Sequence, residues 1–172
     1  MMKIILKAFA VLFVFALQVK ADTSSVPQIK IQGESGVFVL PLDQPVATWA
    51  KIYGMGWHNE KIPTSMGWSM SWRFHRIEMA VTFTGSPLIA TEVSISANEG
   101  QQPLSLAEAT AIAHSLGLRN SKPDPNMEGA PLWSGDHISV RFLGGAELGN
   151  LTAIDMWTDK FPDPTGMMPE PE

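Results

Sequence analysis

The pattern of apolar and polar positions predicts two short strands near the start of the chain. Residues 28–32 (QIKIQ) alternate between polar and apolar side chains, and residues 37–40 (VFVL) form a more continuously apolar run. The segment between them, Gly33-Glu34-Ser35-Gly36, has the composition of a turn. Together the three segments predict an antiparallel hairpin over residues 28–40.

A helical period follows over residues 43–53. Apolar side chains recur at positions 46, 49, 50 and 53, which is the spacing of one helix face. Asp43 is a suitable N-cap, Pro45 fits the first turn, and Gly54 follows the last apolar position as a stop. We therefore expect a helix from Asp43 to Tyr53 with one buried face.

Residues 57–67 show no regular period and contain Pro63 and Gly67, so we expect a loop there. From Trp68 to Phe74 apolar and polar side chains alternate strictly, which predicts a strand.

Over residues 77–83 the apolar positions change from even to odd numbers, and such a shift turns every side chain to the other face. Either a β-bulge near His75 and Arg76 or a bend that changes the buried face explains this change. Residues 84–87 then close a hairpin, and residues 88–96 form the returning strand.

A second helix is predicted over residues 106–116. Ser105 and Glu108 have the spacing of a capping box, and Gly117 follows as the C-terminal stop. Residues 118–132 contain three prolines and are expected to form a loop.

Two further strands are predicted over residues 136–143 and 151–157. The segment 162–172 is Pro-rich and acidic, which predicts a disordered tail.

Short matches between the two halves of the chain indicate an internal duplication. Five segments recur in the same order, mostly at an offset of 61 or 62 positions. They pair Pro41-Leu42-Asp43 with Pro103-Leu104-Ser105, Ala47-Thr48 with Ala109-Thr110, residues 56–61 with 117–122, Met66 with Met127, and residues 71–74 with 139–142. This pattern predicts a helix–loop–hairpin module that occurs twice, as repeat one (41–96) and repeat two (103–157).

These elements predict an α+β fold in one domain, residues 22–161. We expect a mainly antiparallel sheet of about six strands, with two helices packed on one face. Antiparallel sheets often leave their other face to solvent.

The first 21 residues have the pattern of a signal peptide. Lys3 and Lys7 precede the apolar run of residues 8–17, and residues 19–21 (VKA) form a small-x-small cleavage site. Cleavage would remove three lysines and no acid, so the formal net charge would change from −5 to −8. This predicts an exported protein, and its acidity favours a basic protein partner over nucleic acid or anionic lipid.

The chain has no cysteine. A disulfide, a thiol nucleophile, a cysteine-ligated metal and a lipid-modified cysteine are therefore excluded. We expect no cofactor.

No catalytic motif is present. The sequence lacks G-x-S-x-G, H-E-x-x-H and a phosphate-binding glycine loop after a strand. His137 is close in sequence to Ser134 and Ser139, but neighbouring strand residues point to opposite faces. His58, His75 and His137 could meet as metal ligands only through the tertiary fold, since they lack ligand spacing.

The tryptophans divide into core and contact candidates. Trp49 lies on the apolar helix face, and Trp68 and Trp72 alternate with serines as sheet-core residues do. Trp57 lies in an expected loop, where packing and a contact role are equally compatible with its position. Trp133 ends the corresponding loop of repeat two and could anchor it.

The whole chain, from MMKIILKAF through GMGWHNEKIPTSMGWSMSWRF to PDPTGMMPEPE, resembles the periplasmic immunity proteins of type VI secretion peptidoglycan amidase effectors. The resemblance implies that the protein is not an enzyme and that it occludes a cognate Cys–His amidase by inserting a loop. The duplicated plan is also similar to that of the tandem-repeat inhibitor of β-lactamase, which holds an enzyme on a concave sheet.

The two expected loops supply the candidate contact residues. They are Trp57, His58, Asn59, Ser65, Met66, Asn120, Asn126 and Trp133. An alternative interpretation is a periplasmic peptide- or glycan-binding module without an enzyme partner. An enzyme acting on the cell envelope is a third interpretation.

Overall fold

The computed structural model describes residues 26–56, 58–61, 67–144 and 152–161. The signal peptide and the disordered tail expected from the sequence lie outside these residues. Within them, no helix is long and apolar enough to cross a membrane.

The described chain contains two helices and ten strands. In chain order these are β1 (Gln28–Ile29), β2 (Phe38–Val39), α1 (Val46–Tyr53), β3 (His58–Lys61), β4 (Trp68–Arg73), β5 (Ile77–Thr84), β6 (Ile89–Ala97), α2 (Leu106–Ser115), β7 (Ser121–Asp124), β8 (Met127–Ser134), β9 (Ile138–Leu143) and β10 (Ala153–Thr158). Eight strands form one antiparallel sheet in the order β3-β4-β5-β6-β10-β9-β8-β7.

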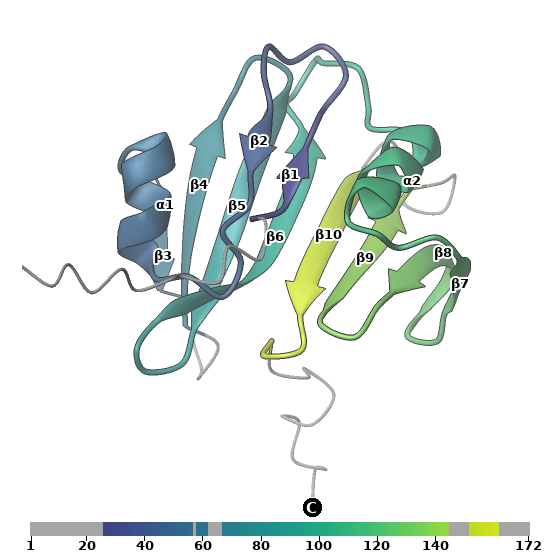
Figure 1. The fold of residues 1–172 in the computed structure, drawn as a ribbon. Coiled ribbons are helices and arrows are strands. Elements are labelled where there is room, and N and C mark those ends of the chain that lie inside the picture. Colours follow the sequence, from purple (N-terminus) through teal and green to yellow (C-terminus); the bar gives the residue numbers. More distant parts are fainter. Residues whose placement is uncertain (1–25, 57, 62–66, 145–151, 162–172) are drawn as a thin grey trace, which may run out of the picture.

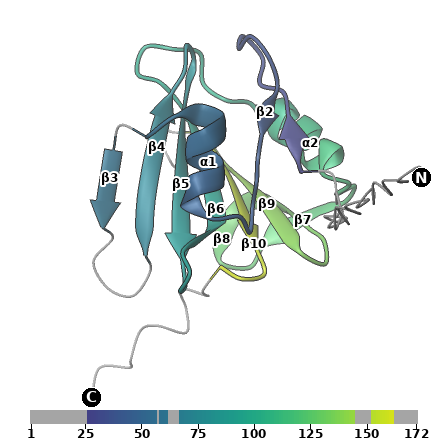
Figure 2. The ribbon, with the colours of Figure 1, turned by 60° about the vertical axis from the view of Figure 1, so that its left-hand side comes forward.

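The remaining elements form a second layer on one side of this sheet. Strands β1 and β2 make a separate two-stranded ribbon, which lies between α1 and α2 (Figure 1). Figure 2 shows the same layer from a second direction, with both helices and the ribbon on the same side. The α+β class, the antiparallel sheet and the placement of two helices on one face are confirmed.

The main sheet has more strands than expected because both predicted loops contain strands. Residues 57–67 include β3, and residues 118–132 include β7 and most of β8. Pro123 lies directly opposite Pro131 in the β7–β8 pair. Neither proline has an N–H to donate, so the two fit a non-hydrogen-bonded pair, and β7 is an edge strand where proline is tolerated.

The change from even to odd apolar positions near residue 75 is a chain reversal, not a bulge or a bend. Strands β4 and β5 form a hairpin in which Trp72 lies opposite Met79 and Met70 opposite Val81. The Phe74 N–H donates to the Ile77 carbonyl oxygen and closes the turn. Because even-numbered residues of β4 lie opposite odd-numbered residues of β5, both apolar sets share one face.

The first helix starts later than predicted. Its N-cap is Pro45, which has no side-chain cap, and the helix begins at Val46. Asp43 instead adopts a left-handed backbone (φ 60°), and its carboxylate accepts a hydrogen bond from Thr158. The sequence predicted Asp43 as the N-cap, but the N-cap is Pro45. The second helix has the predicted capping box at Ser105 and Glu108.

The hydrophobic core lies between the sheet and the second layer. Trp49 of α1 is fully buried, and its ring is stacked on Trp72 at 5.9 Å and meets Phe83 edge-on at 6.3 Å. The indole N–H of Trp49 donates to the Pro41 carbonyl oxygen. Tyr53 donates its hydroxyl to the Val39 carbonyl oxygen at 2.7 Å, and burial raises the pKa of Tyr53 to about 12.

The order of elements is the same in both halves. Helix α1 is followed by four strands, β3 to β6, and α2 is followed by four strands, β7 to β10. The two sets meet at the β6–β10 pair. However, residues 71–74 and 139–142, which we aligned, lie on the second and third strands of their halves, so that equivalence is wrong. The duplication itself stays a prediction.

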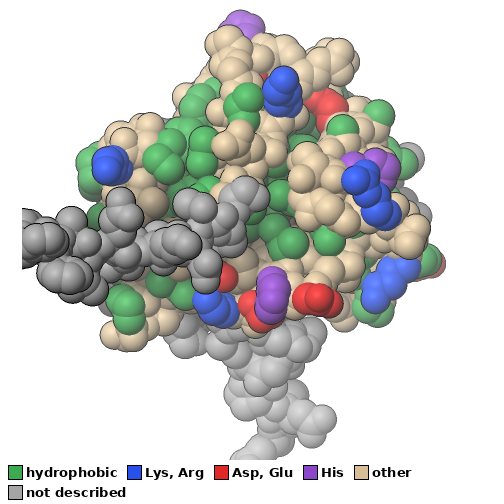
Figure 3. All heavy atoms as spheres, viewed as in Figure 1, with side chains coloured by type: hydrophobic (Ala, Val, Ile, Leu, Met, Phe, Trp, Pro, Cys, Tyr) green, Lys and Arg blue, Asp and Glu red, His purple; other side chains and the backbone are tan. Residues whose placement is uncertain are grey.

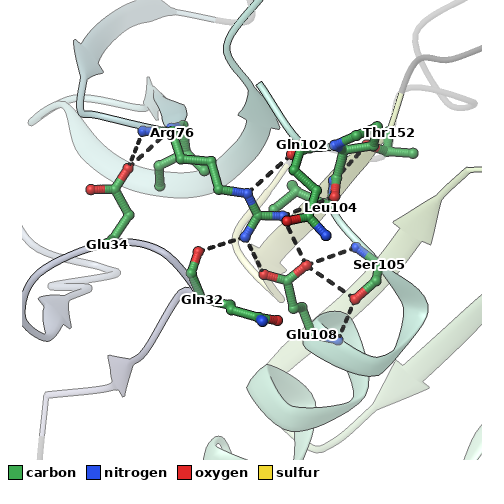
Figure 4. A network of polar contacts seen from close by, with 10 residues as sticks. Gln32, Glu34, Arg76, Gln102, Leu104, Ser105, Glu108 and Thr152 are labelled. Atoms are coloured by element: carbon green, nitrogen blue, oxygen red, sulfur yellow. Dashed lines mark hydrogen bonds and ion pairs between the residues drawn. The ribbon is translucent and has the colours of Figure 1, made fainter. Parts of the chain in front are cut away.

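Arg76 joins the second layer to the sheet (Figure 4). It is 5% exposed, and its guanidinium donates to three backbone carbonyl oxygens and to both carboxylate oxygens of Glu108, at 2.6 and 3.1 Å. Glu34 accepts from the backbone N–H groups of Arg76 and Ile77. One side chain therefore connects the β1–β2 turn, the β4–β5 turn and the start of α2.

A candidate binding face on the sheet

One face of the eight-stranded sheet is not covered by any described helix or strand (Figures 1 and 2). Alternation fixes which residues belong to it: Val93, Ile95, Ile154 and Met156 are fully buried against the second layer, so their neighbours Ser94 and Asp155 lie on the other side. We call this surface the open face. On this side lie Ser69, Ser71, Arg73, Glu78, Ala80, Thr82, Glu92, Ser94, Ser139, Arg141, Ala153, Asp155 and Trp157, of which Ser71, Thr82 and Asp155 are buried.

A single cross-strand row runs through the centre of the open face. The pairing registers align one residue from every strand: His58, Ser71, Ala80, Ser94, Asp155, Arg141, Leu132 and Lys122. The members on β4, β5 and β6 are small, whereas those on β10 and β9 are charged. Ser71, Ala80 and Ser94 thus form a strip of small side chains onto which another backbone can pack closely.

The other half is a charged network around Arg141. Its guanidinium donates to Asp124 at 3.2 Å and to Asp155 at 3.0 Å, and it lies over the Trp157 ring at 5.2 Å. Ser94 donates to the other oxygen of Asp155 at 2.7 Å. The Nε–H of Arg141 is buried and has no acceptor among the described residues. The network holds Arg141 flat against the sheet and leaves one donor unsatisfied.

Glu92 lies beside this network in an unfavourable environment for its charge. Burial raises its pKa, the nearby Asp155 carboxylate adds to the rise, and hydrogen bonding by Thr82 and the charge of Arg141 oppose it. The Thr82 hydroxyl donates to Glu92 at 2.9 Å. Folding therefore favours the protonated form of Glu92, and its contribution to stability decreases as the pH rises above the ordinary pKa of 4.5.

Glu92→Gln is expected to make the fold more stable at about pH 8 and to leave it unchanged at about pH 3, well below the ordinary pKa of 4.5, where Glu92 is protonated in both folded and unfolded states. The gain should be up to about 1 kcal/mol, because glutamine keeps an acceptor for Thr82 and removes only the buried charge. Urea unfolding at the two pH values measures it. The exposed Glu99→Gln is the matched control, and an equal effect of both variants would contradict the interpretation.

The predicted contact residues fall into two groups at opposite edges of the sheet. His58 and Asn59 belong to the edge strand β3, at register positions opposite Ser71 and Met70. Trp57, Ser65 and Met66 lie outside the described residues. Asn120 precedes the other edge strand, β7, and Asn126 lies in the β7–β8 turn; both are exposed.

Trp133 is not a contact residue. It is 3% exposed and belongs to the hydrophobic core. It lies on β8 opposite Val140, on the face covered by the second layer. The prediction failed because residues 127–134 form a strand and not a loop, so alternation turns Trp133 inward.

The described residues do not form a hydrolytic site. His75 and His137 lie in the β4–β5 and β8–β9 turns, which the antiparallel order puts at opposite ends of the sheet. The described part of the chain contains no group of three or more potential ligands that could hold a metal. Ser94 is bonded to Asp155, and the backbone of His58 is three strands away, roughly 14 Å. A serine triad needs a histidine within hydrogen-bond distance.

No protein-family model matches the chain, no curated protein matches its sequence, and no solved structure matches its fold.

The Arg141 network was not among the predicted sites. One signal was present: Asp155 lies between apolar residues of its strand, and aspartate is depleted in strands. Its pairing with Arg141 depends on the β9–β10 register, which the chain pattern alone does not provide.

Proposed function

We propose that the protein is a periplasmic immunity protein that binds a peptidoglycan amidase effector and occludes its active site. The open face is the observation that carries this proposal, because a broad sheet surface without a described covering element suits a protein partner. Its acidic side chains Glu78, Glu92, Asp124 and Asp155 outnumber its basic side chains Arg73, Lys122 and Arg141. With the acidic chain as a whole, this favours association with a basic enzyme.

The open face is smaller than a standard protein–protein interface, so we expect the partner to contact loops at the sheet edge as well. Eight strands span roughly 34 Å, and five residues of strand about 17 Å, so the face measures roughly 600 Å². A standard interface takes roughly 800 Å² from each partner. Edge connections such as residues 62–66 would supply the remaining area and the group that enters the amidase groove.

The test is a binding and activity assay with amidases encoded beside this protein. The mature chain should bind one of them in calorimetry, and an equimolar amount should stop its hydrolysis of purified peptidoglycan. Amidases from unrelated loci serve as controls. If no neighbouring cell-wall hydrolase binds the protein, the proposal is wrong.

The first loop can be tested separately within that complex. Trp57→Ala, or replacement of residues 62–65 by glycines, is expected to weaken binding about tenfold, or about 1.4 kcal/mol, because an interface aromatic or a groove-filling segment is lost. The replacement is limited to residues 62–65 because a longer deletion would remove β3. Unchanged affinity in both variants would remove this loop from the interface.

A peptide- or glycan-binding module is the second candidate. The partly exposed Trp157 on the open face favours it, because an aromatic ring beside polar side chains suits a sugar or a peptide side chain. Saturable binding of peptidoglycan fragments without any protein partner would support this alternative over the immunity function.

A further inference from the structure

A second candidate site lies on the helix side of the sheet, opposite the open face. Five segments meet there around a hollow of about 690 Å³: the start of β1, the loop before α1, the end of α2, the β8–β9 turn and the end of β10. This volume is within the range of small-molecule pockets. Figure 3 views this side of the molecule, where hydrophobic side chains reach the surface and a histidine lies between acidic side chains near the lower edge.

The floor of the hollow is apolar. Leu42, Leu116 and Ile138 are partly buried side chains that pack against the core, and Val26 is 42% exposed beside them. Apolar surface that remains in contact with water in the free protein becomes buried when a ligand covers it, which favours an apolar ligand body.

The rim of the hollow is acidic. Asp43 is fixed there by two bonds, since Thr158 donates to one carboxylate oxygen at 3.1 Å and Lys160 pairs with the other at 3.2 Å. Its side chain remains 31% exposed. Asp43 has a left-handed backbone, which aspartate tolerates better than most residues. The surrounding fold thus holds this carboxylate at the edge of an apolar floor.

Three further features determine the charge at the rim. Asp159 lies 3.4 Å from the ring of His137. Ser115 and Leu116 line the hollow at the C-terminal end of α2, where the helix dipole is negative. Among the described residues at the rim, Lys160 supplies a cationic group, which is already paired with Asp43. The balance favours a positively charged ligand group.

We propose that this hollow binds a small organic cation with an apolar body. The apolar part lies on the floor formed by Leu42, Leu116 and Ile138, and the cationic group lies against Asp43. A second hollow of about 300 Å³ beside α2 shares Gln28 and Ser115 with the first, and Lys30 also lines it. A linear apolar chain therefore fits better than a bulky one. This site is independent of the open face and of the proposed partner.

Three probes with the same apolar chain test the charge preference. Hexylamine, hexanol and hexanoate are titrated into the isotope-labelled mature protein, and amide signals are followed by NMR. Hexylamine should shift the signals of residues around Asp43, Leu116 and Ile138 and should bind about tenfold tighter than hexanol, a difference of about 1.4 kcal/mol. Hexanoate should bind weakest. Equal affinities for the three probes, or shifts confined to other regions, would overturn the proposal.

Two variants locate the interaction. Asp43→Asn keeps a side chain that tolerates the left-handed backbone and an oxygen for Thr158, so the affinity for hexylamine should fall to that for hexanol. Ser115→Phe fills the hollow from the exposed end of α2 and should abolish binding of all three probes. Ala107→Phe, on an exposed part of the same helix, is the control and should change nothing. Retained hexylamine binding in Ser115→Phe contradicts the proposed site even if Asp43→Asn does not fold.

Discussion

Replacing Arg76 with methionine is expected to lower the free energy of unfolding by about 3–5 kcal/mol, measured by urea denaturation. The loss arises because the partners of Arg76 remain buried when the guanidinium is gone. The side chain of Glu108 is only 10% exposed, and it would keep its charge without a cation beside it. The carbonyl oxygens of Gln32, Gln102 and Pro103 would lose their donors as well.

The pH dependence of this effect has a defined sign. Burial raises the pKa of Glu108, but hydrogen bonds from Arg76 and Ser105 outweigh it, so the pKa is lowered overall. The stabilisation is therefore present above the ordinary pKa of 4.5 and is lost as the pH falls below it. Arg76→Met should remove much of this acid sensitivity.

Two comparisons separate this effect from a general response to methionine. Arg119→Met changes an exposed arginine before β7 and should alter stability by less than about 0.5 kcal/mol. Adding Glu108→Gln to Arg76→Met should recover part of the loss, because it removes the uncompensated charge. A destabilisation that is the same for Arg76→Met and Arg119→Met would refute the bridging role of Arg76.

Ala80→Trp is expected to weaken binding of the partner amidase at least about 100-fold, or about 2.7 kcal/mol, without unfolding the protein. Ala80 lies on the open face between Ser71 and Ser94 in the central row. An indole there stands above the surface of small side chains and prevents close approach. Because the side chain points away from the core, the free energy of unfolding should change little. Calorimetric titration measures the affinity, and urea denaturation measures the stability.

Ala107→Trp is the matched control for this substitution. Ala107 is exposed on α2, on the opposite side of the sheet. It should bind the amidase with unchanged affinity. If Ala80→Trp also binds normally while the loop variants do not, the partner contacts only the edge connections, and the open face has no part in the interface.

The sequence pattern was sufficient where local chemistry decides the structure. The Ser105 and Glu108 capping box, the buried face of α2 and the strand from Trp68 were all predictable, because each depends on residues a few positions apart. The placement of two helices on one face followed from their apolar stripes. The N-terminal hairpin was found as well, although the pattern did not show that it would leave the main sheet.

The pattern failed where a strand is polar, short or interrupted by proline. Strand β3 has the sequence HNEK and carries no apolar residue, so only its pairing with β4 reveals it. Strand β7 contains Pro123 and was read as loop for that reason. Strand β8 was missed as well, and this misplaced the contact prediction, since Trp133 was assigned to a loop that is a strand.

The Arg141 network could not be predicted from the sequence pattern for a different reason. Its charged members come from β7, β9 and β10, and Asp124 and Asp155 are both 6% exposed. No local pattern relates Asp124 to Asp155. Only the strand order β10-β9-β8-β7 brings the two carboxylates to one guanidinium, so this site is a product of topology.

The pairing of β6 with β10 has a consequence for how the chain folds. Ile95 lies opposite Ile154, about 60 residues later in the chain, whereas β4, β5 and β6 pair with close neighbours. Loop closure over that distance must precede the pairing, so the two half-sheets should form first and join in the slowest step. Until they join, β6 and β10 are unpaired edges with apolar side chains on one face, the kind of edge that aggregates. Conditions that slow this joining should therefore lower the yield of refolded protein more than they lower its final stability.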